Sequence, residues 1–261
     1  MRTWLLAVAL GLAAWPAAAQ DGTTLAKTGA SFVDRFATLD STRWYISHGW
    51  ANGPHQNCTW TDANVRVEGS VALSLTDNPS ADRPYSCAEL QTREFFGYGT
   101  YEVRMRSVAA PGTVSAFFTY TGPPHGRPHD EIDFEFLGKS PTQVFLNYFA
   151  GGRKHEQYVP LHFDATAAAN NFAFEWTAEG LRWFANGRLI REELASKGAD
   201  LPTTPQKIYL SIWNGTDGDQ EAWLGRFAYP GRPLIALFEH VAFTEAGAAC
   251  QFPESVVCRK Q

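Results

Sequence analysis

The sequence predicts an all-β fold, a sandwich of two packed antiparallel sheets, on three observations. Short runs of alternating apolar and polar residues recur along the chain and are separated by clusters of turn-forming residues. No long amphipathic helix and no repeat of the solenoid or propeller kind interrupts them. The chain has 261 residues, of which 44% are hydrophobic and 19% charged. Because sandwiches commonly reach about 200–250 residues undivided, we expect one large domain.

The alternating runs place the expected strands along the chain. They lie at residues 64–67, 71–75, 99–106, 114–120, 131–137, 143–149, 171–176, 180–185, 188–190, 207–213 and 238–243. Between two of these runs, Asn186-Gly187 predicts a two-residue hairpin, because both turn positions favour a positive φ.

The N-terminus has the pattern of a secretory signal peptide. Arg2 precedes an apolar stretch at 4–12, and three alanines at 17–19 follow Pro16. The stretch is shorter than the roughly 20 apolar residues of a membrane-spanning helix, and no later segment is long enough. We therefore expect residues 1–19 to be a signal peptide and the protein to be secreted, either extracellular or periplasmic.

The remaining chain divides into three segments. Residues 20–30 are small and polar and are expected to form a flexible lead-in. Residues 31–244 carry the expected strands and form the folded domain. Residues 245–261 form a C-terminal tail with a local disulfide.

Charge and aromatic content narrow the choice of partner. The net charge of -5 provides no basic field for a phosphate backbone, so nucleic acid is not expected as a partner. The chain has 9 Trp, 9 Tyr and 18 Phe. The Phe residues suit a core, whereas flat rings with a polar group, as in Trp and Tyr, suit contact with sugar rings.

The four cysteines predict two disulfide bonds. An even number of cysteines in an exported chain favours pairing, and the local solution joins Cys58 to Cys87 and Cys250 to Cys258. Zinc binding is the competing interpretation. Because no pair has the close spacing of a zinc knuckle and no histidine pair accompanies them, we expect no metal ligands here.

Three acidic residues alternate along one expected strand. Glu131, Asp133 and Glu135 therefore share one face, and the apolar residues between them share the other. A solvent-facing acidic edge is the simpler interpretation of such a run. Three like charges in a row would repel one another, and a chemical role for the three residues would explain why they lie together.

The spacing of the two glutamates suits glycosidic bond hydrolysis. Residues four apart on a strand have Cα atoms about 13 Å apart. Two glutamates leaning inward can bring their carboxyl groups to the ~5–5.5 Å of a retaining glycosidase. Repulsion within the trio keeps one carboxyl protonated while its neighbour stays ionised. One glutamate then acts as the acid and the other as the nucleophile, although this chemistry alone assigns neither role.

The chain resembles glycoside hydrolase family 16, whose signature is Glu-x-Asp-x-Glu on a strand of a jelly-roll β-sandwich. Glu131, Asp133 and Glu135 match it. The likeness covers nearly the whole mature chain, through segments such as Phe96-Gly-Tyr-Gly-Thr-Tyr-Glu-Val and Ile212-Trp-Asn-Gly-Thr. It implies a jelly roll with a concave substrate cleft, and it makes residues 31–244 the catalytic domain.

The resemblance also implies roles for individual residues. Glu131 corresponds to the nucleophile, Glu135 to the acid/base, and Asp133 to the group that assists the proton and charge balance between them. Cys58 and Cys87 occupy the family disulfide positions. Eight residues are expected to contact substrate: Asn52, Glu89, Phe118, Tyr120, His129, Asn147, Trp213 and Trp223. Core packing is an equal alternative for Phe118 and Trp223. His129 is expected to tune the carboxylate titration or to contact substrate, and a plain hydrogen bond to a neighbour is an equal alternative for it.

The likeness points to bacterial lichenases, which cut 1,3-1,4-β-glucans, and to succinoglycan-type exopolysaccharide glycanases. Lichenases usually carry arginine, tryptophan, tyrosine and asparagine at the positions of Gln91, His129, Phe149 and Ser211. Because three of these changes remove polar partners for sugar hydroxyls, we expect faster turnover on an acidic bacterial exopolysaccharide than on barley-type glucan. A protonated His129 would favour carboxylate substituents.

Two other functions stay open at this point. A jelly roll can bind sugars as a lectin without cutting them, and plant xyloglucan transglycosylases share the His-Asp-Glu-Ile-Asp-Phe-Glu-Phe-Leu-Gly run that starts at His129. In every case we expect a monomer with a polysaccharide partner and no membrane partner. Double displacement requires no cofactor, and the resemblance leaves a structural calcium ion open, because some relatives bind one.

Overall fold

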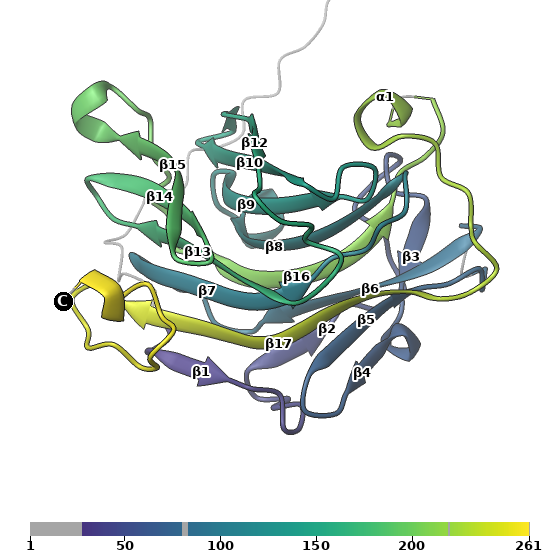
Figure 1. Ribbon diagram of the computed structural model, residues 1–261, viewed down its shortest axis with the longest axis horizontal. Helices are drawn as coiled ribbons and strands as arrows, with labels where there is room; N and C mark the ends of the chain where they lie inside the picture. The colour runs from purple at the N-terminus through teal and green to yellow at the C-terminus, as the bar shows by residue number, and fades with distance from the viewer. Residues whose placement is uncertain (1–27, 80–82, 219, 261) are drawn as a thin grey trace, which may run out of the picture.

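The computed structural model describes residues 28–79, 83–218 and 220–260. The expected signal peptide and most of the expected lead-in at 20–30 lie outside these residues. The described chain begins its first strand at Phe32 and ends its last strand at Glu245 (Figure 1).

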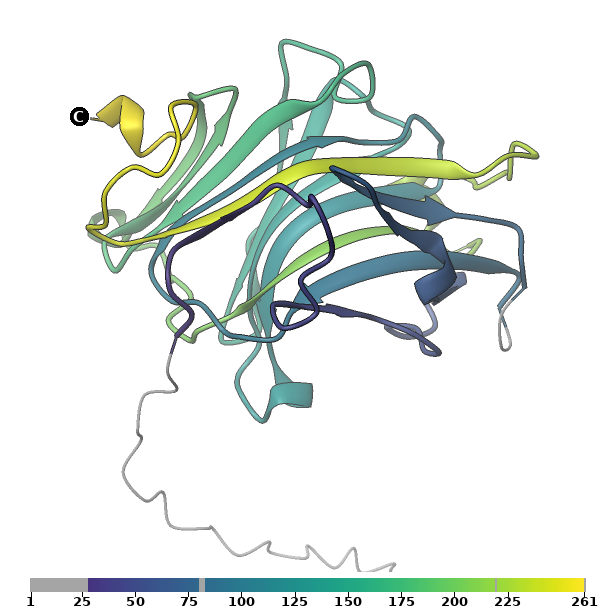
Figure 2. The same cartoon turned by 90° about the horizontal axis from the view of Figure 1, so that it is seen from below.

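Within the described residues, the strands form two sheets packed face to face (Figures 1 and 2). The eight-stranded sheet has the order β15 (Arg188–Leu194), β14 (Gly180–Ala185), β13 (Asn170–Trp176), β7 (Gly99–Arg106), β17 (Leu234–Glu245), β5 (Val71–Leu75) and β4 (Val65–Val67), and β1 (Phe32–Asp34) pairs with β17. This sheet is antiparallel throughout its described pairings.

The nine-stranded sheet carries the acidic strand between β10 (Gln143–Ala150) and β8 (Thr113–Thr121). Its order is β11 (Arg153–Lys154), β10, β9 (Asp130–Leu137), β8, β16 (Lys207–Asn214), β6 (Tyr85–Thr92) and β2 (Trp44–Ile46), with β12 (Gln157–Pro160) paired to β10 and β3 (Cys58–Trp60) to β6. The β3–β6 pair is parallel and the others are antiparallel. The expected antiparallel two-sheet sandwich is confirmed.

Helical segments in the described residues are short. They are η1 (Asp62–Asn64), η2 (Pro123–His125), η3 (Ala195–Lys197), α1 (Glu221–Leu224) and η4 (Cys258–Lys260). None of the helices in this part of the chain has the length and apolarity needed to cross a membrane.

The core lies between the two sheets and explains the alternation along β9. Ile132 and Phe134 are fully buried and Phe136 is 2% exposed, whereas the acidic residues between them face outward. The Phe134 ring packs against Phe172 of the opposite sheet at 5.5 Å between centroids. Full burial of a Phe side chain contributes about 1.5–3 kcal/mol, so the inward row fixes which way the carboxyl groups point.

Most expected strands are confirmed to within two residues, but several strands were missed. The hairpin at Asn186-Gly187 joins β14 to β15, with φ of 49° and 78° at the two turn residues. The missed strands are β1, β2, β3, β6, β11 and β12. Of these, β6 is buried at nearly every position, so it lacks the alternation on which the sequence argument depends.

Two disulfides join the expected partners, Cys58 with Cys87 and Cys250 with Cys258. The first links β3 to β6 beside the open face of the nine-stranded sheet. The second lies in the C-terminal segment, at the edge near β13 and β14 in Figure 2.

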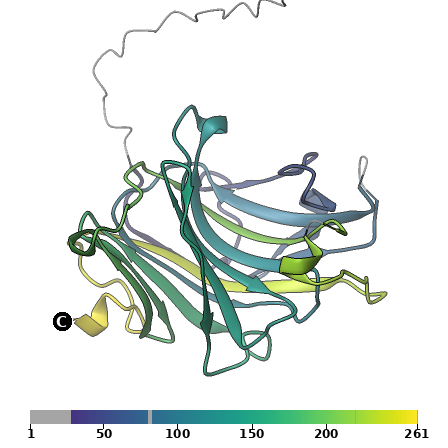
Figure 3. The same cartoon turned by 90° about the horizontal axis from the view of Figure 1, so that it is seen from above.

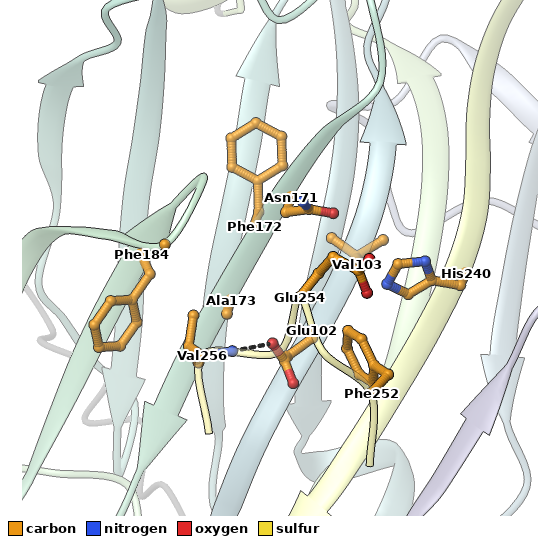
Figure 4. A pocket seen from close by; sticks show the side chains of 11 residues that line it. Glu102, Val103, Asn171, Phe172, Ala173, Phe184, His240, Phe252, Glu254 and Val256 are labelled. Carbon is orange, nitrogen blue, oxygen red and sulfur yellow. Dashed lines mark hydrogen bonds between the residues drawn. The ribbon is translucent and has the colours of Figure 1, made fainter. Parts of the chain in front are cut away.

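The C-terminal segment is fastened to the eight-stranded sheet through Glu102 of β7. Its carboxylate accepts hydrogen bonds from the Ser255 hydroxyl at 2.5 Å and from the Val256 backbone N–H at 2.9 Å. A hollow of about 10 Å³ remains beneath the segment (Figure 4). The tail therefore covers this part of the sheet rather than leaving a binding cavity there.

Candidate active site

A cleft of about 1130 Å³ lies on the outer face of the nine-stranded sheet. Its floor is formed by β6, β16, β8, β9 and β10. Two short elements, drawn as the teal and lime-green coils in Figure 3, also contribute to its lining: η2 provides Pro124 and His125, and α1 provides Trp223. The sequence-predicted residues all line this cleft: Asn52, Glu89, Phe118, Tyr120, His129, Glu131, Asp133, Glu135, Asn147, Trp213 and Trp223.

The strand register sets the three acidic residues in rows that cross the sheet. Each has one neighbour on β8 and one on β10: Tyr120 and Phe149 beside Glu131, Phe118 and Asn147 beside Asp133, Ala116 and Phe145 beside Glu135. Because the cleft spans strands on both sides of β9, the acidic residues lie at its middle. A chain molecule lying across the strands over Asp133 would therefore have Glu131 on one side and Glu135 on the other.

Burial and mutual repulsion raise the pKa values of two members of the trio. The pKa of Glu135 rises to about 8, chiefly because of burial and then because of the negative charge of Glu131. The pKa of Asp133 rises well above its usual value through burial, the charges of both glutamates and a side-chain hydrogen bond with Glu131. Near neutral pH, Glu135 therefore holds a proton that it can donate.

Glu131 is held by a histidine rather than by burial alone. His129 Nε2 lies 2.5 Å from Glu131 Oε2. The imidazole stacks on Phe149, with 4.1 Å between ring centroids, and meets the edge of Tyr120 at 5.3 Å. The ring is thus fixed on two sides, and its contact with Glu131 fixes that carboxylate within the cleft.

Asn147 links the trio to the cleft. Its Nδ2 donates to Asp133 Oδ2 at 3.1 Å, while its buried Oδ1 has no partner among the described residues. A buried acceptor of this kind gains from a donor such as a sugar hydroxyl.

A further buried carboxyl in the cleft, that of Glu89 on β6, is separated from the trio by two strands, β8 and β16. Glu89 is 2% exposed, and burial raises its pKa to about 7 in spite of hydrogen bonds from Ser47 and Gln91. Ser47 donates to Glu89 Oε1 at 2.6 Å, and Gln91 Nε2 donates to Ser47 at 3.1 Å. The network continues to Lys207, whose Nζ donates to Gln91 Oε1 at 3.4 Å.

Aromatic side chains form much of the remaining cleft surface. Phe118 stacks on Tyr209 at 4.8 Å and 15°, and Trp213 lies 6.1 Å from Trp223. Phe118 and Trp223 are partly exposed in the cleft and also pack against a small apolar cluster. Each side chain is therefore placed both to contact substrate and to pack against the core, the two alternatives that the sequence left open. Asn52 is exposed at the rim, where Trp60 Nε1 donates to its Oδ1 at 3.4 Å.

Sequence reasoning missed several residues that line the cleft. Tyr209 and Phe145 could have been found, because they lie two residues from Ser211 and Asn147 on the same faces of their strands. Lys154, Glu156 and Tyr158 could not, because β11 and β12 are too short to show an alternating pattern. Lys154 forms an ion pair with Glu156, and its charge lowers the pKa of Glu135 in part.

Among residues 28–79, 83–218 and 220–260, no three His, Cys, Asp or Glu side chains are grouped as a metal site. Calcium also takes backbone and amide carbonyl oxygens as ligands, and the structural calcium that the resemblance leaves open stays a prediction.

The fold and the cleft together define a class, the β-sandwich glycoside hydrolases with an acidic trio on one strand. The chain belongs to one family of that class, because residues 52–229 match the model of glycosyl hydrolases family 16.

Its relatives agree with this assignment. The chain is 42% identical to the endo-1,3-1,4-beta-glycanase ExoK of Rhizobium meliloti, over 88% of this chain and 84% of that protein. It is also 42% identical to the beta-glucanase of Bacillus subtilis, over 85% of this chain and 90% of that protein. The solved structure of the Bacillus licheniformis beta-glucanase matches with a TM-score of 0.78 and 39% identity. The match covers 84% of this chain and 100% of that chain.

Proposed function

We propose that the protein is a secreted, retaining endo-β-glycanase that hydrolyses internal β-glucosidic bonds of a 1,3-1,4-β-glucan or a succinoglycan-type exopolysaccharide. The observation that carries this proposal is the arrangement of the trio in the cleft: burial and the charge of Glu131 raise the pKa of Glu135, while Glu131 faces His129. A cleft that extends across strands on both sides of β9 suits an attack within a chain rather than at its end.

The reaction follows a double displacement. Glu135 protonates the glycosidic oxygen as the bond breaks, and Glu131 attacks the anomeric carbon to form a glycosyl-enzyme. Glu135, now ionised, then accepts a proton from the water that attacks the same carbon, and the bond from that carbon to Glu131 breaks, which releases the product and the free carboxylate. Asp133 lies between them and hydrogen bonds to Glu131, so it shares the charge that moves along the strand during both steps.

The contacts of His129 modify one expectation about specificity. Its Nε2 is engaged with Glu131, so its role is better described as positioning that carboxylate than as attracting carboxylate substituents of a substrate. The proposal that turnover on acidic exopolysaccharide exceeds that on barley-type glucan therefore depends on other cleft residues. Gln91 already donates to Ser47 and Ser211 has a short side chain, so both offer sugar hydroxyls fewer contacts than longer polar side chains would.

A panel assay tests the proposed function. Reducing-end release is measured on lichenan, laminarin, xyloglucan and succinoglycan, with the Glu131→Gln variant as the control. We expect release from lichenan or succinoglycan that depends on Glu131. Binding without release would indicate a lectin, and longer products formed with an added acceptor oligosaccharide would indicate a transglycosylase. Elution as a monomer in size-exclusion chromatography is expected.

A further inference from the structure

Beyond Tyr120, the cleft borders a group of cationic side chains that the proposed catalysis does not use. We call Arg93, Arg127 and Lys207, together with His125, the basic rim. They come from separate segments: the end of β6, the loop before β9, the start of β16 and η2. Register places Lys207 opposite Tyr120, which itself lies opposite Glu131. At ~4.8 Å between strands, Lys207 is thus about 10 Å from the catalytic strand.

One aromatic ring organises this group. The guanidinium of Arg127 lies over the Phe95 ring at 4.3 Å from its centroid, and Lys207 Nζ lies at 5.4 Å. His125 meets the same ring edge-on at 5.2 Å. Cation–π contacts with this one ring therefore keep both cations, Arg127 and Lys207, within about 10 Å of each other.

The polar contacts of the three cations are to uncharged groups. In the described part of the chain, Arg93, Arg127 and Lys207 form no ion pair with an Asp or Glu. Their polar contacts are to neutral oxygens: Arg93 to Ser41 O, Arg127 to Pro205 O and Lys207 to Gln91 Oε1.

Burial and the neighbouring positive charges also lower the pKa values of Lys207 and His125. The pKa of Lys207 is lowered by burial and by the charge of Arg93, and that of His125 by burial and by the charges of Lys207 and Arg127. Like charges that form no ion pair within the described residues, in a protein whose net charge is -5, favour an anion from outside the chain.

The basic rim is continuous with the cleft. His125 lines the cleft and lies 5.6 Å from Tyr120 between ring centroids, and Gln91, which also lines it, accepts the hydrogen bond from Lys207. A sugar chain that lies over Tyr120 in the cleft can therefore place an anionic substituent against Arg127 and Lys207.

We propose that the basic rim is a subsite for a carboxylate substituent on the polysaccharide, with Arg127 and Lys207 as its specificity-determining residues. This inference rests on the proposed function and names its substrate class as acidic rather than neutral β-glycans. A guanidinium can hydrogen bond both oxygens of one carboxylate, and an ammonium within reach of the same carboxylate adds a further charged donor.

The test compares one polysaccharide in two charge states. Succinoglycan is used as such and after chemical reduction of its carboxyl groups to alcohols, which keeps every linkage and removes the charge. We expect kcat/KM for the native polymer to exceed that for the reduced polymer. The ratio should fall about tenfold in Arg127→Gln and in Lys207→Gln, the loss expected for one charge-assisted hydrogen bond.

Three controls separate a binding role from a structural one. Arg127→Lys and Lys207→Arg keep the charge and should keep most of the ratio. Arg66→Gln removes an exposed arginine from the other sheet and should leave the ratio unchanged. Added salt should weaken the preference for the native polymer in the unaltered protein, because exposed charges are screened.

Two results would overturn the subsite. One is a ratio that does not change in either glutamine variant, and the other is an equal loss on both polymers, which would mean that the cations only support the loop. The proposed function is judged separately, by whether the unaltered protein cleaves lichenan or either form of succinoglycan at all.

Discussion

His129 Nε2 lies 2.5 Å from Glu131 Oε2, while the same imidazole stacks on Phe149. The contact joins a residue just before β9 to the carboxylate proposed as the nucleophile. It orients that carboxylate without occupying the space above Asp133 and Glu135, so the geometry of the nucleophile depends on an aromatic cage outside the acidic trio.

Replacing His129 with Phe tests this positioning role. The ring remains between Phe149 and Tyr120, but the hydrogen bond to Glu131 is lost. Since hydrogen bonds to charged groups contribute about 1.5–3 kcal/mol, kcat should fall roughly tenfold to a hundredfold, with a smaller change in KM. Steady-state kinetics and a thermal unfolding curve measure the two effects. An unchanged kcat in a folded variant would show that Glu131 needs no support from His129.

The pH dependence of activity should report the proton on Glu135. With its pKa raised to about 8, Glu135 loses its proton as the pH rises through this value, so kcat/KM should decline above about pH 8. Glu131→Gln removes a nearby negative charge and should lower the pKa of Glu135. Carbon NMR of labelled glutamate carboxyls follows that titration directly. A Glu135 signal that titrates at the same pH with and without the Glu131 charge would refute the coupling.

Stability should decrease as the pH rises across the neutral range. Glu89 and Glu135 have usual values of 4.5, raised by burial to about 7 and about 8. Between pH 4.5 and these values the folded state binds more protons than the unfolded state, so the free energy of unfolding falls with pH. Asp133 acts in the same direction.

Urea unfolding at pH 5 and pH 8 measures this dependence. The Glu89→Gln variant should lose part of the difference, since its side chain does not titrate. If the variant and the unaltered protein show the same pH dependence, Glu89 ionises freely in the folded state.

The disulfide between Cys58 and Cys87 should contribute more to stability than the one between Cys250 and Cys258. Their sequence separations are 29 and 8 residues. In the chain-entropy model the longer loop corresponds to about 3–4 kcal/mol. Paired Cys→Ser variants, compared by urea unfolding, give both contributions. A larger loss from the Cys250 and Cys258 pair would mean that the fastening of the tail to Glu102 dominates.

The sequence predicts the acidic strand well because its two faces differ so strongly. Ile132 and Phe134 are buried against the other sheet, which forces Glu131, Asp133 and Glu135 outward. The hairpin at Asn186-Gly187 can also be predicted from the sequence, because the positive φ of its two turn residues is favoured by the residue types at those two positions.

Other parts of the site depend on contacts that no local pattern encodes. Lys207 and Arg127 are 80 positions apart in sequence, and both contact the Phe95 ring. The pKa values of Glu89 and Glu135 arise from burial, which depends on how the sheet is covered. The residues on β11 and β12 belong to strands of 2 and 4 residues, too short for a periodic signal.

Loss of either glutamate should nearly abolish hydrolysis. Glu131→Gln and Glu135→Gln change volume little but remove the nucleophile or the acid, so kcat should drop by roughly 10²–10⁴-fold. Asp133→Asn should be impaired less, because Asp133 acts through its neighbours. Near-normal turnover in either glutamine variant, after correction for contaminating activity, would contradict the assignment.

The stereochemistry of the product tests the central claim most directly. Two carboxyl groups on one strand face are expected at the ~5–5.5 Å of a retaining enzyme, with Glu131 attacking the sugar first. Proton NMR, recorded during the first minutes of β-glucan hydrolysis, distinguishes the anomers before they interconvert. The account predicts that the β-anomer appears first. Initial formation of the α-anomer would mean that water attacks the sugar directly, and Glu131 would not be a nucleophile.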